Sequence, residues 1–247
     1  QASGLALIPP QKRNSRTATS VGTGELFRIV LNRGYRKVIL FLGGSATNDA
    51  GAGLLHALGV RLLDKNGKEL PPGGIHLINL ETIDVTKLDP RLKETDIVVA
   101  TDVTNPLRGP NGASAIYGPQ KGASPNVVKE LDAALTQFAK IVKRSLGRDI
   151  AECPGAGAAG GVGAALLAFT NSTVQSGIDL ICDTLHVDDH FRNTNLVITG
   201  EGRIDRSTIF NKAPVGIARR AKTFGIPVIA LAGSLGSGYR DVYSQGI

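Results

Sequence analysis

Four short hydrophobic segments, each followed by a loop of glycine, hydroxyl-bearing and acidic residues, constrain this chain more than any other feature. The segments and their loops are Val38–Leu42 with 43–49, Ile97–Ala100 with 101–106, Leu196–Ile198 with 199–205, and Val228–Leu231 with 232–234. Such segments, alternating with helical patterns, predict an α/β fold with mostly parallel strands and flanking helices. Open α/β sheets bind ligands beyond the carboxyl ends of their strands, so the four loops predict one polar, glycine-lined site.

The clearest helix is expected at Pro125–Leu146. Ser124 is suited to cap it, proline suits its first position, and Gly147 is suited to end it. Further elements are expected as helices at Thr23–Arg33, Ala52–Leu58, Ala158–Phe169 and Gly216–Phe224, as a hairpin of Val60–Leu63 and Lys68–Leu70, and as a strand within Ile78–Asp84. Residues 1–20 are expected to have little regular structure.

Composition excludes several classes of protein. At 247 residues and 42% hydrophobic residues, the chain can bury a sizeable core in one large or two smaller domains. The net charge of +7 is scattered and aromatic residues make up 4%, so no nucleic-acid partner is expected. No apolar stretch is long enough to span a membrane, and no membrane partner is expected. Cys153 and Cys182 lack metal-binding spacing, which favours a cytoplasmic chain with reduced thiols.

The first glycine-rich loop is a candidate anion site. Its backbone amides could hold a phosphate or a carboxylate at the start of a helix, and the alternative is a tight turn between strand and helix. The residues that we assign here to substrate or phosphate binding are Gly43, Gly44, Ser45, Thr47, Asn48 and Asp49.

The other loops supply charged candidates. Asp102 follows a buried strand and could bind Mg²⁺ or accept a proton from a substrate hydroxyl, or it could simply cap the next turn. Arg203 could clamp a carboxylate or phosphate, with Glu201 and Asp205 as metal or general-base groups. The alternative is that Arg203 pairs with a neighbouring acid to steady its own loop. Lys121 is a candidate for neutralising phosphate.

A further glycine motif is weaker evidence for a binding site. Gly155, Gly157 and Gly160 have the spacing of a dinucleotide fingerprint, with Asp179 further on, but Pro154 precedes them and no good strand comes before it. A glycine-rich entry to a packed helix is therefore the preferred interpretation, and NAD binding is disfavoured. The sequence contains no phosphate-loop motif of the common NTPases, and its four histidines lack zinc spacing.

Taken together, these stretches resemble the bacterial glycerate kinase family. The motifs that carry the resemblance occur in the family's order over nearly the whole chain and are 43–53 (GGSATNDAGAG), 102–107 (DVTNPL), 109–113 (GPNGA), 117–122 (YGPQKG), 154–161 (PGAGAAGG) and 199–205 (TGEGRID). The resemblance implies transfer of the γ-phosphate of ATP to D-glycerate with Mg²⁺, giving 2-phosphoglycerate, with 3-phosphoglycerate as the other product that the sequence leaves open.

The resemblance also implies two α/β domains, one inserted into the other, with the active site between them. Residues 1–195 are expected to be largely the inserted domain, and 196–247 part of a discontinuous, Rossmann-like outer domain. Asp102 and Asp205 are assigned to Mg²⁺ or the glycerate hydroxyl, and Arg203 and Lys121 to charge neutralisation. The binding residues assigned beside those of the first loop are Asn105, Gly155, Gly157, Gly200 and Glu201.

The family's N-terminal strand and its Asp-Ser-Phe-Lys loop have no counterpart here, nor has its C-terminal helical segment. We therefore expect a fragment that is folded at least in part but inactive alone, and whose exposed sheet edge favours association, including a homodimer. A non-catalytic α/β protein that binds small anions or nucleotides is the main alternative, and Mg²⁺-dependent nucleotide binding separates the two. A Rossmann-type dehydrogenase is a third hypothesis.

Overall fold

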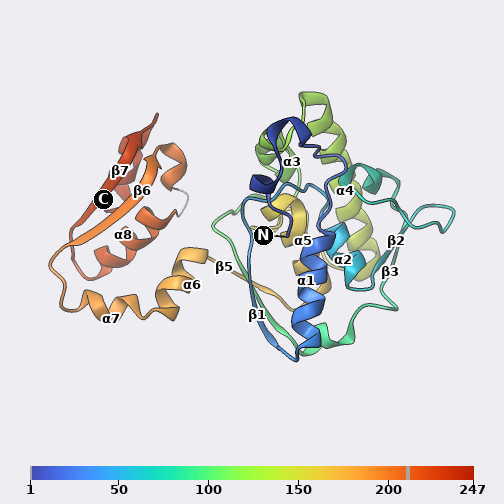
Figure 1. Cartoon of the computed structure of the whole chain (residues 1–247), viewed down its shortest axis with the longest axis horizontal. Helices are drawn as coiled ribbons and strands as arrows, with labels where there is room; N and C mark the ends of the chain where they lie inside the picture. Colours follow the sequence, from blue (N-terminus) through green and yellow to red (C-terminus); the bar gives the residue numbers. More distant parts are fainter. Residues whose placement is uncertain (1, 210–211) are drawn as a thin grey trace. The chain divides into compact units, whose positions relative to one another are not determined.

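The computed structural model describes residues 2–209 and 212–247, and the chain divides into two compact units, Gln1–Val174 and Gln175–Ile247 (Figure 1). Parallel strands and helices occur in both, which confirms the predicted α/β class. The units divide before the predicted boundary at residue 195, and the arrangement of an inserted and an outer domain stays a prediction.

A parallel pair of strands forms the centre of the larger unit. β1 (Lys37–Phe41) pairs with β4 (Asp96–Ala100), and the three-residue strand β5 (Thr173–Gln175) completes the order β1-β4-β5. Ile97 and Val99 in the middle strand are fully buried. The two hydrophobic runs that predicted β1 and β4 therefore form adjacent strands with nearly the expected bounds.

The long helix α4 (Pro125–Leu146) has the predicted bounds. The Val127 N–H donates to the Ser124 hydroxyl at its start, and Gly147 ends it with φ 69°. Its apolar stripe is buried in the core of the larger unit, where Phe138 has no exposed surface. A strong cap, a first-turn proline and a terminal glycine thus fixed this helix locally, and burial of its stripe anchors it.

Four shorter helices complete the larger unit (Figure 1): α1 (Val21–Asn32), α2 (Ala52–Ala57), α3 (Ala113–Tyr117) and α5 (Ala158–Phe169).

The expected hairpin is shorter than predicted. The turn at 64–67 forms, but β2 (Arg61–Leu63) pairs antiparallel with β3 (Thr82–Asp84), and residue 69 contributes only an isolated bridge to Leu63. Of the strand expected within Ile78–Asp84, only β3 forms, and Ile78 and Asn79 instead end a 3₁₀ helix, Gly74–Asn79. Residues 2–20 contain two single-turn 3₁₀ helices.

The smaller unit contains a parallel two-stranded sheet joined by a helix. β6 (Val197–Ile204), α8 (Ala213–Thr223) and β7 (Val228–Leu235) follow each other, after the short helices α6 (Gly177–Thr184) and α7 (Val187–Phe191). Alternate residues on one face of the sheet are exposed, including Ile198 at 62% and Leu231 at 63%. Among the described residues, no helix is long and apolar enough to cross a membrane.

The predicted loops at 199–205 and 232–234 are wrong. β6 continues through Gly200 and Glu201, which pair with Leu231 and Ala232 of β7. Glycine and glutamate have low strand propensity, which is why the sequence indicated loops. Pairing with the neighbouring strand satisfies their backbone groups and overrides that local preference.

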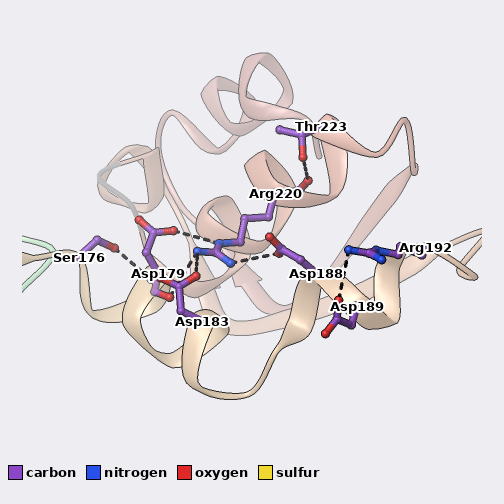
Figure 2. Close-up of polar contacts among 8 residues, drawn as sticks. All are labelled: Ser176, Asp179, Asp183, Asp188, Asp189, Arg192, Arg220 and Thr223. Carbon is purple, nitrogen blue, oxygen red and sulfur yellow. Dashed lines mark hydrogen bonds and ion pairs between the residues drawn. The ribbon is translucent and has the colours of Figure 1, made fainter.

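One arginine ties the helices of the smaller unit together (Figure 2). The Arg220 guanidinium on α8 pairs with Asp179 (3.3 Å) and Asp183 on α6, and with Asp188 on α7 (3.1 Å). Its side chain is 18% exposed, so these carboxylates replace most of the water that the charge has lost.

Candidate active site

The carboxyl ends of β1 and β4 place two predicted loops beside each other. Phe41 at the end of β1 is in register with Ala100 at the end of β4, and the Leu42 N–H continues the pairing to the Ala100 carbonyl (2.9 Å). The glycine-rich loop, residues 43–53, and the acidic loop, residues 101–106, therefore leave the sheet at the same edge. This is the edge at which open α/β sheets bind ligands.

A third glycine-rich segment, residues 155–161, packs against both loops. The Gly157 N–H donates to the Asn105 carbonyl of the acidic loop (3.0 Å), and the Ala50 N–H of the glycine-rich loop donates to the Gly160 carbonyl (3.0 Å). Side chains at the two glycines would separate these backbones. Three segments far apart in sequence therefore meet at one end of the sheet.

The third segment does not have the structure of a dinucleotide-binding motif. Turn residues precede Gly155 in place of a strand, and α5 starts with three left-handed residues, Ala159, Gly160 and Gly161 (φ 52°, 72° and 97°). The dinucleotide motif requires a strand, a tight turn and a regular helix start. The observed geometry agrees with a glycine-rich entry to a packed helix.

The glycine-rich loop has an exposed half and a buried half. Gly43 and Gly44 are exposed, and a Cβ on either would have no atom within 4 Å. Ser45 is half-buried, and the residues from Ala46 to Ala50 are buried. Only the first half of the loop therefore presents its backbone to a ligand.

The polar side chains of the buried half face the protein interior. The Thr47 hydroxyl donates to the Ala159 carbonyl (3.3 Å), and the Asn48 amide donates to the Ser114 hydroxyl (2.8 Å). Asp49 has no exposed surface. In this conformation these three predicted binding residues are occupied by internal contacts, and their assignment to ligand binding stays a prediction.

Asp49 links the loop to the start of α1. Its carboxylate accepts hydrogen bonds from the Ser20 N–H and hydroxyl (both 2.8 Å) and from the N–H groups of Gly51 and Gly53 (both 3.2 Å). Burial raises the pKa of Asp49, and these four donors act in the opposite direction. Four donors around one carboxyl group are the pattern that an ionised carboxylate requires.

Lys121 reaches the same loop from inside the protein. It is 3% exposed, and its Nζ donates to the Thr47 carbonyl (2.6 Å) and to the Ser45 hydroxyl (3.0 Å). Burial lowers the pKa of Lys121 to about 8, while the charge of Asp49 opposes this shift. The buried half of the loop therefore has a buried carboxyl group of its own, Asp49, and a buried ammonium group, Lys121, in contact with it.

Asp102 and Asn105 lie in the acidic loop. Asp102 is half-buried and the second residue after the end of β4. The Asn105 side chain accepts from the Tyr117 hydroxyl (2.7 Å) and donates to the Asn111 carbonyl (2.8 Å). The structure thus brings Asp102 to the edge of the sheet, while Asn105 holds the surrounding loop together.

The remaining predicted residues lie in the smaller unit. Gly200 and Glu201 are within β6, and Arg203, 65% exposed, forms an ion pair with Asp205 (3.5 Å). This is the structural alternative that the sequence left open for Arg203. The exposed guanidinium retains donors for an anion, and its assignment stays a prediction.

Sequence reasoning missed Ser20, whose hydroxyl donates to the Asp49 carboxylate, and Ser114, whose hydroxyl accepts from the Asn48 amide. Ser20 lies 29 positions from Asp49, and Ser114 lies 66 positions from Asn48. No local pattern signals contacts of this separation.

The donor chemistry for Mg²⁺ is present only in part. The described residues contain no group of three or more histidine, cysteine or acidic side chains placed to hold a metal. Mg²⁺ commonly uses one or two carboxylates together with substrate phosphates, so Asp102 alone fits such a role. Asp205 lies in the other unit and is paired with Arg203.

Comparison with known proteins decides the family. The model of the glycerate kinase family matches residues 1–247. The chain belongs to the glycerate kinase family. This confirms the resemblance carried by the six motifs.

Named members of the family are similar throughout the chain. Glycerate kinase of Haemophilus influenzae is 52% identical over 246 residues, and glycerate 2-kinase of Escherichia coli is 50% identical over 246 residues. Both alignments cover 100% of this chain and 65% of the relative. A crystal structure from Salmonella typhimurium LT2, provisionally assigned as glycerate kinase 2, matches with a TM-score of 0.82 at 45% identity, covering 99% of this chain and 70% of that one. The chain thus spans about two thirds of the length of these family members.

Proposed function

We propose that the protein is an ATP-dependent glycerate kinase that transfers the γ-phosphate of ATP to D-glycerate and yields 2-phosphoglycerate. The supporting observation is the exposed Gly43-Gly44 backbone beside the Asp102 loop, at the carboxyl ends of two parallel strands. Membership of the glycerate kinase family supplies the substrate class. The choice of the 2-hydroxyl rests on the glycerate 2-kinase among the relatives.

The proposed step is a direct phosphoryl transfer. A hydroxyl oxygen of glycerate forms a bond to the γ-phosphorus, and the bond from that phosphorus to the β,γ-bridging oxygen breaks, which releases ADP. Asp102 accepts the proton that the hydroxyl loses. Catalysis of this kind consists mainly of positioning and charge neutralisation, which exposed amides and an arginine supply.

Each candidate residue has its own proposed role. The amides of Gly43 and Gly44 and the Ser45 hydroxyl bind an anionic group of the substrates, because unpaired N–H groups favour negative oxygens. Arg203 binds a carboxylate or phosphate through its planar pair of donors. Asp102 and Asp205 are the two candidates for Mg²⁺; where Asp102 accepts the proton, Asp205 would hold the metal, which would neutralise phosphate charge.

A chimera tests the proposal in a protein of full family length. This 247-residue chain replaces the matched segment of the E. coli relative, and glycerate-dependent ADP release is measured with and without Mg²⁺. Carbon NMR of the product distinguishes 2- from 3-phosphoglycerate. A folded chimera that binds MgATP but phosphorylates neither hydroxyl would contradict the proposal.

A non-catalytic protein that binds small anions is the second candidate. The observation that favours it is the inward position of Asp49, which leaves the exposed half of the loop without its own carboxylate. Calorimetry with ATP separates the candidates, because a kinase requires Mg²⁺ for productive nucleotide binding and a simple anion receptor does not. Nucleotide affinity that is identical with Mg²⁺ and with EDTA would favour the anion receptor.

We also propose a cytoplasmic location and a homodimer. Cys153 and Cys182 are free thiols, which suits a reducing compartment. The exposed aliphatic face of the β6–β7 sheet supplies apolar surface for self-association. Sedimentation of the wild type and of an Ile198→Lys variant tests the dimer, since a lysine on this face should shift the population to monomer.

A further inference from the structure

Lys121 combines a buried charge with direct contacts to the glycine-rich loop. Its Nζ lies 2.6 Å from the Thr47 carbonyl and 3.0 Å from the Ser45 hydroxyl, and only 3% of the residue is exposed. A ligand on the exposed side of the loop would be separated from Nζ by the loop backbone. The geometry therefore differs from that of a lysine that touches phosphate.

The direction of the Ser45 hydrogen bond has a chemical consequence. Lysine Nζ has only donors, so the Ser45 oxygen accepts from it and the Ser45 hydrogen is directed away from Lys121. Ser45 is half-buried and follows the two exposed glycines. Its hydroxyl is thus held as a donor next to the exposed amides.

Two backbone hydrogen bonds join the loop to residues 3–5 on either side of Ser45. The Leu5 N–H donates to the Gly44 carbonyl (2.8 Å), and the Ala46 N–H donates to the Ser3 carbonyl (2.8 Å). Both bonds flank Ser45, whose oxygen Lys121 holds. Release of Ser45 and Thr47 would let this part of the loop move away from residues 3–5.

We propose that Lys121 is a positioning residue that fixes the exposed half of the glycine-rich loop from within and sets Ser45 as a hydrogen-bond donor to an anion. The proposal rests on the proposed anion-binding function of this loop. In this proposal Lys121 does not neutralise the substrate directly; it acts by holding Ser45 and Thr47 in place.

Hydrogen exchange of the ligand-free chain tests the anchor independently of activity. Lys121→Met keeps most of the side-chain volume and removes the donors. We expect exchange of the Ala46 and Leu5 amides to accelerate about tenfold or more, as loss of a charged hydrogen bond predicts. Amides in the middle of α4 should keep their wild-type rates. Lys129→Met is the matched control, because Lys129 is exposed on α4.

Ser45→Ala provides a second variant that leaves Lys121 in place. It should accelerate the same two amides if Lys121→Met fails to fold. Wild-type exchange at Ala46 and Leu5 in either folded variant would overturn the proposal. Uniform acceleration across α4 and the loop would also overturn it, because it would show a general structural role.

The affinity for inorganic phosphate, measured by calorimetry between pH 7 and 9, gives a readout that a purely structural lysine would not change. Asp49 is the charged group recorded facing Lys121 among the described residues. We expect wild-type affinity to fall about threefold or more above pH 8 as the ammonium charge is lost, while the weaker affinity of Lys121→Met stays flat. Parallel profiles would contradict an effect on the anion. Absence of phosphate binding in the wild type would remove the anion function, and the exchange experiment would still decide the anchor.

Discussion

Two glycines near the candidate active site have similar backbone conformations and opposite surroundings. Gly44 has φ 61°, and Gly160 has φ 72°. A Cβ at Gly44 would have no atom within 4 Å, whereas a Cβ at Gly160 would lie 1.9 Å from the Thr47 carbonyl oxygen and 2.8 Å from the Asn48 Cα. Alanine at Gly44 therefore measures the cost of backbone strain alone, and alanine at Gly160 measures the cost of strain together with overlap with neighbouring backbone atoms.

The expected losses in stability differ by about 1–3 kcal/mol. A left-handed conformation costs an L-residue about 1–2 kcal/mol, and this is the whole penalty expected for Gly44→Ala. Gly160→Ala adds an overlap with backbone atoms, which cannot rotate away as a flexible side chain can. Overpacking of this kind adds about 1–3 kcal/mol, so we expect a total of about 2–5 kcal/mol.

Urea denaturation followed by circular dichroism at 222 nm measures both losses. The larger unit contains α4 and α5 and supplies most of the helical signal. Gly67→Ala is the matched control for strain, because Gly67 has φ 76° and open space around its Cβ. Gly44→Ala should also weaken phosphate binding, and Gly67→Ala should not. Equal losses at Gly44 and Gly160 would refute the assignment of Gly160 to backbone packing.

Four further predictions address charged groups. Burial lowers the pKa of Lys121 to about 8, so above that pH the folded state holds fewer protons than the unfolded state. The free energy of unfolding of the wild type should therefore rise with pH. Urea titrations should show a rise of about 2 kcal/mol between pH 7.5 and 9.5 relative to Lys121→Met. Asp102→Asn in the chimera should abolish glycerate-dependent ADP release with an unchanged dichroism spectrum, and near-normal turnover would remove Asp102 from the site. Arg203→Lys should weaken anion binding more than it lowers Tm, as calorimetry and a thermal melt can show. Arg220→Met should destabilise the smaller unit by about 2 kcal/mol, seen as faster hydrogen exchange in α8, because three carboxylates lose a shared partner.

Local signals predicted the elements that local chemistry determines. The helix Pro125–Leu146 has its cap, its first-turn proline and its terminal glycine within the segment itself, and the structure reproduces its bounds. The hydrophobic runs of β1 and β4 predicted two strands for the same reason, since each run has the length of one strand, whereas their pairing with each other was seen only in the structure. The ends of β6 and β7 were missed because pairing between them, and not their own propensity, makes residues 199–204 a strand.

The sequence did not predict which side chains of the candidate site face the protein interior. The polar run from Ser45 to Asp49 predicted a loop that contacts a ligand, but only its first residue is near the exposed glycines. Asp49 faces inward because Ser20, 29 positions away, supplies two of its donors. Lys121 faces inward because the Thr47 carbonyl, 74 positions away, accepts from it. Contacts of this separation are set by the packing of the whole unit.

The buried charges determine how an anion is recognised at this loop. The positive charge of Lys121 and the negative charge of Asp49 lie in the same buried half, so their fields partly cancel at the exposed half. Under the proposed function, recognition there comes mainly from the oriented N–H groups of Gly43 and Gly44 and from the Ser45 hydroxyl. Such donors favour an oxyanion by direction more than by net charge. Under the proposed function, the positive charge that binds ATP and stabilises its transferring phosphate must then come from groups outside this loop.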